Sequence, residues 1–229
     1  MKAIVLVLLS LPLALSVTAQ TRFNPNLKRE LDSLHAADQR WRVLLFDPRM
    51  SRKTDSLSTA FGVRKEALGA RIARRMQQTD SANQVRIAAI IKQYGYPGKS
   101  LVGVPTNEAA WYIIQHSEGI DQYLPAIKTA ARKGELPFFL YAQMLDRQSM
   151  RDGKEQRYGT QGMGYSPTNP VTGRRETQPP FIWPIEDAAD VNARRKKAGF
   201  LTTVEQNAAA LGITYRVLTL QDVAGMPKN

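Results

Sequence analysis

His116 is the residue of this sequence with the best position for acid–base chemistry. It ends an apolar run, and Glu108 and Tyr112 precede it at steps of four residues, which would place the three side chains on one stripe of a helix. A neighbour on that stripe could hold the imidazole in one tautomer, as a general base or acid requires. The alternative is a structural histidine that caps the C-terminus of a helix, where the helix dipole favours a positive charge.

Asp146 and Arg147 form a charged pair that follows an otherwise apolar segment. Buried charges are costly unless they are paired. In a functional arrangement, Asp146 accepts a hydrogen bond from His116, and Arg147 binds an anion through two parallel hydrogen bonds. In a structural arrangement, the two residues form a salt bridge near a helix end.

The segment Gln156–Gln161 is dense in hydrogen-bond donors and acceptors. Its alternation predicts a strand with Gln156, Tyr158 and Thr160 on one face, and Gly159 would let the backbone approach a ligand. The alternative is an ordinary polar hairpin at a sheet edge. Further along, Arg194 or Arg195 must face the protein, where a single arginine usually serves an ion pair.

The composition excludes several kinds of site. The chain has two histidines and no cysteine, which excludes disulfides, thiolate catalysis and cysteine-based zinc sites. A glycine-rich phosphate loop, a His-Glu-x-x-His pair, a Gly-x-Ser-x-Gly elbow and an EF-hand loop are also missing from the sequence. We therefore expect neither a bound metal nor a cofactor.

The first 19 residues are typical of a secretory signal peptide. Lys2 precedes an apolar run from Ala3 to Leu15, and the small residues Val17-Thr18-Ala19 follow. The run is shorter than the roughly 20 residues that a membrane-spanning helix needs, although an uncleaved anchor is the alternative. With cleavage after Ala19, we expect an exported protein, periplasmic or extracellular, without a later membrane-spanning segment.

The charge balance is strongly basic, with 32 Lys and Arg against 20 Asp and Glu and a formal net charge of +12. The charges are scattered, and no interleaving of basic and aromatic residues suggests stacked bases, so we do not expect specific nucleic-acid binding. In an exported protein the partner would be a small anionic ligand or an envelope glycan.

Periodicity predicts a mainly α-helical fold, a helical bundle with a small β-hairpin packed on it. Six helices are expected first, over about 25–47, 56–76, 80–95, 106–119, 121–133 and 136–151. The hairpin would pair 156–161 with 180–184 around a tip rich in Pro, Gly, Thr and Asn. Asp187 would cap a helix that ends near Lys197, and Thr202 with Glu205 would form the capping box of a last short helix. Residues 215–220 suit either a short strand or an ordered tail.

These elements suggest four parts of the chain, which are a signal peptide (1–19), an N-terminal helical segment (20–93), a domain of helices plus hairpin (94–215) and a tail (216–229).

Several motifs occur in a fixed order: Tyr94-Gly95-Tyr96-Pro97, Ala110–His116, Leu145-Asp146-Arg147, Gln156–Gln161, Pro184–Asp187, Val191–Arg195 and Gly199. In this order they resemble an uncharacterised family of bacterial domains of unknown function, often exported in Bacteroidetes-like bacteria. The resemblance covers about Gln93 to Tyr215 and implies grouping, not a reaction. The long insert from about Gly162 to Pro180 departs from the shorter connection that the family pattern implies. The matching residues are Trp111, Gln115, His116, Asp146, Arg147, Gln156, Tyr158, Gly159, Thr160, Gln161, Asp187 and Arg195.

A pattern made chiefly of polar residues is rarely what packing alone demands, and it leads to two hypotheses. In the first, the protein is a hydrolase or transferase with His116 as acid or base and Asp146 as its orienter. Its substrate would be anionic or glycan-like, bound by Arg147, Arg195, Gln156, Tyr158, Thr160 and Gln161, with Trp111 and Gln115 alongside. In the second, the protein is a non-catalytic envelope binding protein, and the polar cluster holds the hairpin on the bundle.

Overall fold

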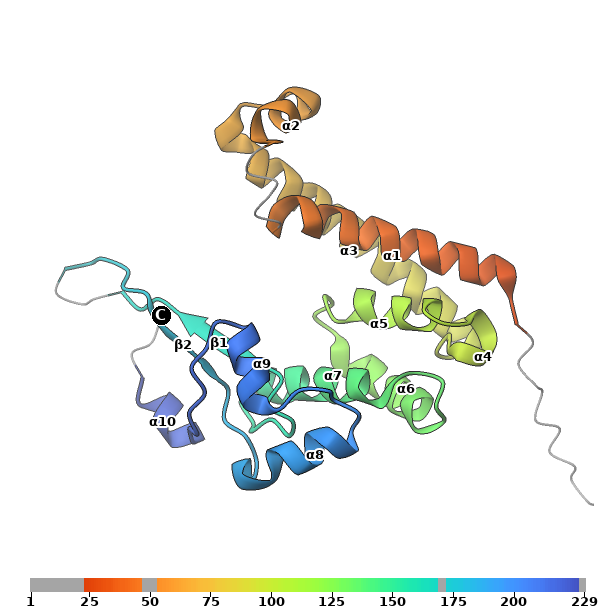
Figure 1. Cartoon of the computed structure of the whole chain (residues 1–229). Helices are drawn as coiled ribbons and strands as arrows, with labels where there is room; N and C mark the ends of the chain where they lie inside the picture. Colours follow the sequence, from red (N-terminus) through yellow and green to blue (C-terminus); the bar gives the residue numbers. More distant parts are fainter. Residues whose placement is uncertain (1–22, 47–52, 169–171, 227–229) are drawn as a thin grey trace, which may run out of the picture.

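A computed structural model describes residues 23–46, 53–168 and 172–226. The signal peptide expected at residues 1–19 lies outside the described residues. The described chain is mainly α-helical and contains a two-stranded antiparallel sheet, as the sequence predicts. Figure 1 shows α1 and α3 lying alongside each other and extending beyond the body of the molecule, with α2 at their far end.

The N-terminal part consists of α1 (Pro25–Phe46), α2 (Thr54–Phe61) and α3 (Lys65–Tyr94). The start of α1 agrees with the predicted signal, because Asn24 Oδ1 accepts a hydrogen bond from the backbone N–H of Leu27 at 3.0 Å. The ranges 56–76 and 80–95 are largely helical, as predicted, and α3 ends before Gly95. The break expected between them is wrong, because α3 runs without a break through Asp80 and the helices are separated near Gly62 instead. Asp80 is not a cap; its carboxylate accepts two hydrogen bonds from Arg42 Nη2 of α1, both at 3.0 Å.

The body begins with α4 (Lys99–Val102), a 3₁₀ turn (Thr106–Glu108), α5 (Ala109–Ile114), α6 (Ile120–Arg132) and α7 (Phe138–Arg151). The helix expected over 106–119 is shorter than predicted. After Ile114 the backbone hydrogen bonds tighten, with His116 donating to the carbonyl of Ile113 and Ser117 to that of Ile114. Glu108, Tyr112 and His116 therefore do not form one helical stripe.

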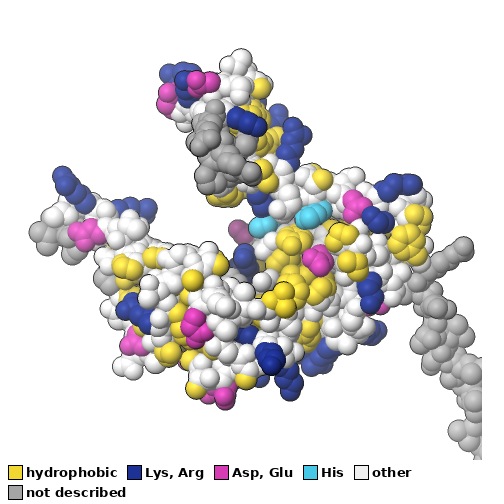
Figure 2. Space-filling model, in the orientation of Figure 1, with side chains coloured by type: hydrophobic (Ala, Val, Ile, Leu, Met, Phe, Trp, Pro, Cys, Tyr) yellow, Lys and Arg dark blue, Asp and Glu magenta, His cyan; other side chains and the backbone are white. Residues whose placement is uncertain are grey.

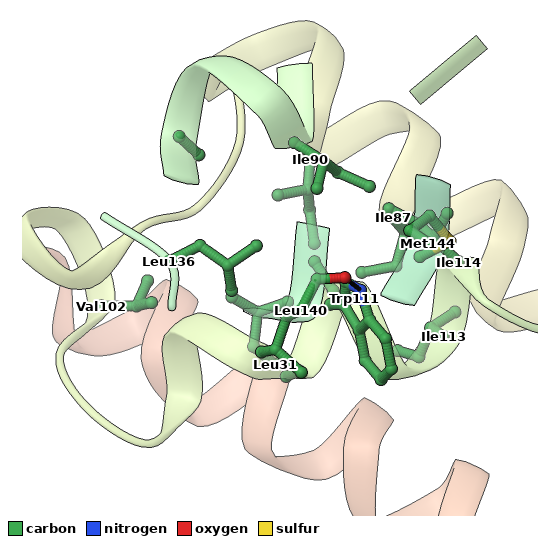
Figure 3. Close-up of a cluster of buried hydrophobic side chains, with 14 of the residues drawn as sticks. Leu31, Ile87, Ile90, Val102, Trp111, Ile113, Ile114, Leu136, Leu140 and Met144 are labelled. Atoms are coloured by element: carbon green, nitrogen blue, oxygen red, sulfur yellow. Dashed lines mark hydrogen bonds between the residues drawn. The ribbon is translucent and has the colours of Figure 1, made fainter. Parts of the chain in front are cut away.

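The main core lies where α1 and α3 meet α5, α6 and α7. Figure 3 shows Leu31, Ile87, Trp111 and Leu140 packed together in this cluster. The indole Nε1 of Trp111 donates to the backbone carbonyl of Leu140 at 2.7 Å, which satisfies its polar atom inside the core. The cluster thus joins residues from both sides of the domain boundary expected at residues 93–94, and that division stays a prediction.

The sheet pairs β1 (Gly162–Tyr165) with β2 (Gln178–Ile182), and Gly162 lies opposite Ile182. The strand expected over 156–161 is wrong, because within this segment only Gln156 makes a β-bridge, a parallel one to Ile185. Its polar groups instead form the hydrogen-bonded turn described below. The segment predicted as extended, 180–184, overlaps the end of β2.

The C-terminal part consists of a 3₁₀ turn (Ala188–Asp190), α8 (Val191–Lys197), α9 (Val204–Ala210) and α10 (Leu220–Ala224). Asp187 makes no side-chain cap, and the capping box of α9 is formed by Thr203 and Gln206, one residue beyond the predicted pair. The segment 215–219 has no regular structure. Within the ranges that the structure describes, no helix has both the length and the apolar character that a bilayer span requires.

Candidate functional site

A hollow of about 510 Å³ lies where α5 and α7 face the hairpin and α9. We call it the main cleft. It brings together residues from three segments that the sequence analysis singled out, and these five line it: Trp111, Gln115, Arg147, Thr160 and Gln161.

Arg147 is the only ionisable side chain among the described residues that line the main cleft. Its Nη1 donates to the backbone carbonyl of Gln115 at 3.1 Å, and this is its one hydrogen bond within the described chain. Burial lowers the pKa of Arg147 below its usual value, and the charge of Arg151 acts in the same direction. A partly buried guanidinium with unused N–H groups is suited to bind a carboxylate or a phosphate.

Side-chain amides supply the other polar groups of the main cleft. Gln115 and Gln143 make no side-chain hydrogen bond with the rest of the described chain, so both ends of each amide are available. Gln161 donates from Nε2 to Thr160 Oγ1 at 3.0 Å, and Asn207 donates from Nδ2 to the carbonyl of Gly159 at 3.0 Å. Each of these two amides keeps its oxygen as an acceptor.

Apolar groups complete the main cleft. Trp111 is only 6 % exposed, so little of its ring reaches the surface. Leu211 and Ile213, which follow α9, also line the hollow. The site therefore combines one cation, several amides and an apolar wall, which is a composition typical of small-molecule sites.

Asp146 lies outside this lining and is completely buried. Its carboxylate accepts hydrogen bonds from the backbone N–H of Arg157 (2.8 Å), Tyr158 (3.0 Å) and Thr160 (3.0 Å) and from Thr160 Oγ1 (2.9 Å). We call this arrangement the Asp146 anchor. Burial raises the pKa of Asp146, and these four donors oppose the increase.

The Asp146 anchor corrects two sequence-based expectations. The hydrogen bond expected from His116 to Asp146 is wrong, because the donors to Asp146 come from the segment 157–160. The salt bridge proposed as the structural alternative is also wrong, because Arg147 does not pair with Asp146. The carboxylate instead fixes the backbone that carries Thr160 into the main cleft.

Gln156 and Arg195 are buried and bond the backbone of the protein itself. Gln156 is fully buried, donates from Nε2 to the carbonyls of Gln161 (2.9 Å) and Trp183 (2.7 Å), and accepts from the N–H of Gln161 at 2.8 Å. Arg195 is 1 % exposed and donates from Nη1 to the carbonyl of Tyr158 at 2.7 Å. Neither lines the main cleft, so the structure does not place them where a ligand in that cleft would be.

Tyr158 faces away from the main cleft, and its ring packs with Ala142 and Ala198 in a small cluster. The glycine that follows it is required by packing. Gly159 has a φ of 66°, and a Cβ there would lie 2.6 Å from Val204 Cγ2. Its close approach is to the core of the C-terminal part and not, as expected, to a ligand.

His116 lies near the main cleft but does not line it. Burial lowers the pKa of His116 to about 4, and the charges of Arg42 and Arg147 add to this effect. Its Nε2 is buried and has no hydrogen-bond partner in the described chain. Figure 2 shows both histidines of the chain on one face, where the projecting helices join the body. A role for His116 as acid or base stays a prediction.

A second charged group near His116 was not singled out from the sequence. Asp38 of α1 is 1 % exposed, and its Oδ1 lies 3.0 Å from Arg42 Nη1. Burial raises the pKa of Asp38 to about 6, while the charge of Arg42 opposes this. Arg42 also pairs with Asp80, so these three residues join α1 to α3.

Two amides of the main cleft, Gln143 and Asn207, were missed by sequence reasoning. Gln143 precedes Arg147 by four residues, and this spacing on one helix face was the available signal. Asn207 comes from α9, and its position in the cleft depends on tertiary packing that no local pattern shows. Within the described residues, no three His, Asp or Glu side chains come together as metal ligands would.

Comparison with known proteins identifies the family. A model described as a family of unknown function, DUF6624, matches residues 59–217, which is most of the chain and begins in α2. Searches of curated proteins and of solved structures found no match. The chain therefore belongs to the DUF6624 family of unknown function.

Proposed function

We propose that this protein is an exported binding protein that takes a small anionic, glycan-like ligand in the main cleft. One observation carries the proposal: a single partly buried guanidinium lies among side-chain amides that keep donors or acceptors without a partner in the described chain. Such a site matches a molecule with one acidic group and several hydroxyl or amide groups, because each free donor and acceptor then gains a partner.

The preorganised backbone of the main cleft supports binding further. The Asp146 anchor and the hydrogen bonds of Gln156 hold residues 157–161 in place without a ligand. Groups that are already fixed lose little conformational entropy when a ligand binds. The signal-peptide character of residues 1–19 supports export, which would bring the cleft to the compartment where acidic envelope sugars occur.

A hydrolase or transferase reaction is the second candidate, and the neutral imidazole of His116 favours it. Its pKa of about 4 keeps the ring unprotonated at neutral pH, and its Nε2 has no partner among the residues that the structure describes. Binding is the better-supported function, because His116 is outside the lining and Asp146 is not available to orient it.

The proposal is tested by calorimetric titration of the chain, without its signal peptide, with glucuronate as the acidic sugar and glucose as its neutral counterpart. Glucuronate is expected to bind and glucose to bind much more weakly. Arg147→Gln should weaken glucuronate binding about 10- to 100-fold, the usual effect of losing a hydrogen bond to a charged group.

Arg151→Gln is the matched control. Arg151 lies one turn further along α7 and also donates from Nη1 to a backbone carbonyl, that of Ser117 at 2.9 Å, but it does not line the main cleft. Its replacement should leave glucuronate binding unchanged. Equal losses in the two variants, or equal binding of glucuronate and glucose, would refute the assignment.

A further inference from the structure

Another hollow, of about 390 Å³, lies at the beginning of the segment 157–160, whereas the main cleft is lined by the end of that segment. We call it the basic hollow. It is formed by the start of α7, the beginning of that segment and the end of α8, and its lining residues are Phe138, Arg157, Tyr158, Arg194, Lys197 and Ala198. None of them lines the main cleft.

Three cations line the basic hollow, and the carboxylate of Glu186 contacts one of them. Arg157 Nη1 lies 3.2 Å from Glu186 Oε2, and both side chains are about half exposed. Arg194 donates to the carbonyls of Arg157 (3.1 Å) and Asp187 (3.0 Å) and to that of Glu186, so its guanidinium is fixed although no carboxylate of the described residues pairs with it. Lys197 is exposed and makes no ion pair with a described residue.

This arrangement leaves positive charge unbalanced. Arg157 and Arg194 are held close together, since the side chain of the second bonds the backbone of the first. A carboxylate, phosphate or sulfonate group in the hollow would reduce the repulsion between these cations, and the unused N–H groups of both guanidiniums could bind it.

The basic hollow also has an aromatic lining, which inorganic anions do not require. Phe138 and Tyr158 both line it, and both belong to one small apolar cluster with Ala198. The ring of Tyr158 is held in position, because it packs against Phe200 with ring centroids 5.9 Å apart. Two aromatic residues beside three cations favour a ligand that is itself a ring with an acidic substituent.

We propose that the basic hollow binds an aromatic anion, a planar ring that carries a phosphate, sulfonate or carboxylate group. This site is separate from the main cleft and does not depend on the function proposed for it. The acidic group lies among Arg157, Arg194 and Lys197, and the ring lies against Phe138 and Tyr158.

The test is calorimetric titration of the chain, without its signal peptide, with phenyl phosphate as the probe. Inorganic phosphate tests the charge alone, and phenol tests the ring alone. Phenyl phosphate is expected to bind at least about tenfold more tightly than either. If phosphate binds as tightly as phenyl phosphate, the aromatic class of ligand is refuted.

Lys197→Gln should weaken phenyl phosphate binding about tenfold or more, the usual loss of a charged contact. Lys196→Gln is the matched control, since Lys196 is the exposed neighbour on α8 and lies outside the hollow. Equal losses in both variants would mean attraction by overall charge and would overturn the proposal. Arg147→Gln should leave phenyl phosphate binding unchanged, and a loss there would place the probe in the main cleft instead.

Discussion

Asp146→Ala tests whether the buried carboxylate is structural or functional. The change removes the acceptor of three backbone N–H groups and of the Thr160 hydroxyl, at a residue with no exposed surface. Each buried donor without a partner costs about 1–3 kcal/mol. Because the turn can relax and the terms are not additive, we expect a loss of about 4 kcal/mol in the free energy of unfolding.

Urea denaturation followed by circular dichroism measures this loss. Asp152→Asn is the matched control: Asp152 follows the same helix, is exposed, and accepts from Gln148 Nε2 at 2.8 Å. Its replacement should change the free energy of unfolding by less than about 0.5 kcal/mol. A stable Asp146→Ala protein, within about 1 kcal/mol of the wild type, that loses glucuronate binding would refute the structural role and return Asp146 to the site.

Two further predictions concern buried positive or ionisable groups. The pKa of His116, lowered from 6.5 to about 4, means that between these pH values the unfolded chain binds a proton that the folded chain does not. The free energy of unfolding therefore decreases as the pH falls through this window. Between pH 7 and pH 4, His116→Gln should lose about 1–2 kcal/mol less of this free energy than the wild type, after allowance for partial exposure. Urea denaturation at the two pH values measures the difference, and equal losses in the two proteins would contradict the prediction. Arg195→Lys should lose about 2–3 kcal/mol, because a lysine cannot replace the bonds to the carbonyls of Tyr158 and Thr202. Thermal unfolding measures this loss of stability. Lys196→Arg is the control and should leave the unfolding midpoint unchanged, so equal midpoints in the two variants would contradict the prediction.

Much of the helical fold could be predicted from local sequence. Asn24-Pro25 marks the start of α1, and the apolar spacing of Leu27 and Leu31 indicates the face that enters the core. These signals are local, and tertiary contacts act in the same direction. At Asp80 the local signal and the tertiary contacts disagree. The local sequence resembles the start of a helix, but the ion pair of Asp80 with Arg42 stabilises this residue inside α3.

The candidate site could be predicted only in part. Polar residue types point to the segments around Gln115, Arg147 and Gln161, and the structure brings these segments together in the main cleft. Which side chains face the cleft could not be predicted, since the segment 156–161 was interpreted as a strand with alternating faces. Its conformation depends instead on the buried Asp146 and on the positive φ of Gly159, and a period of two does not describe such a turn.

The Asp146 anchor has a consequence for how recognition can vary among related sequences. The carboxylate contacts the N–H groups of residues 157 and 158, which every amino acid except proline supplies, and not their side chains. The side chain at position 157 can therefore be exchanged without moving the main chain that presents it. If the basic hollow binds the proposed anion, a change of side chain at position 157 would alter ligand preference, while the backbone N–H bonds to Asp146 that hold the turn would be kept.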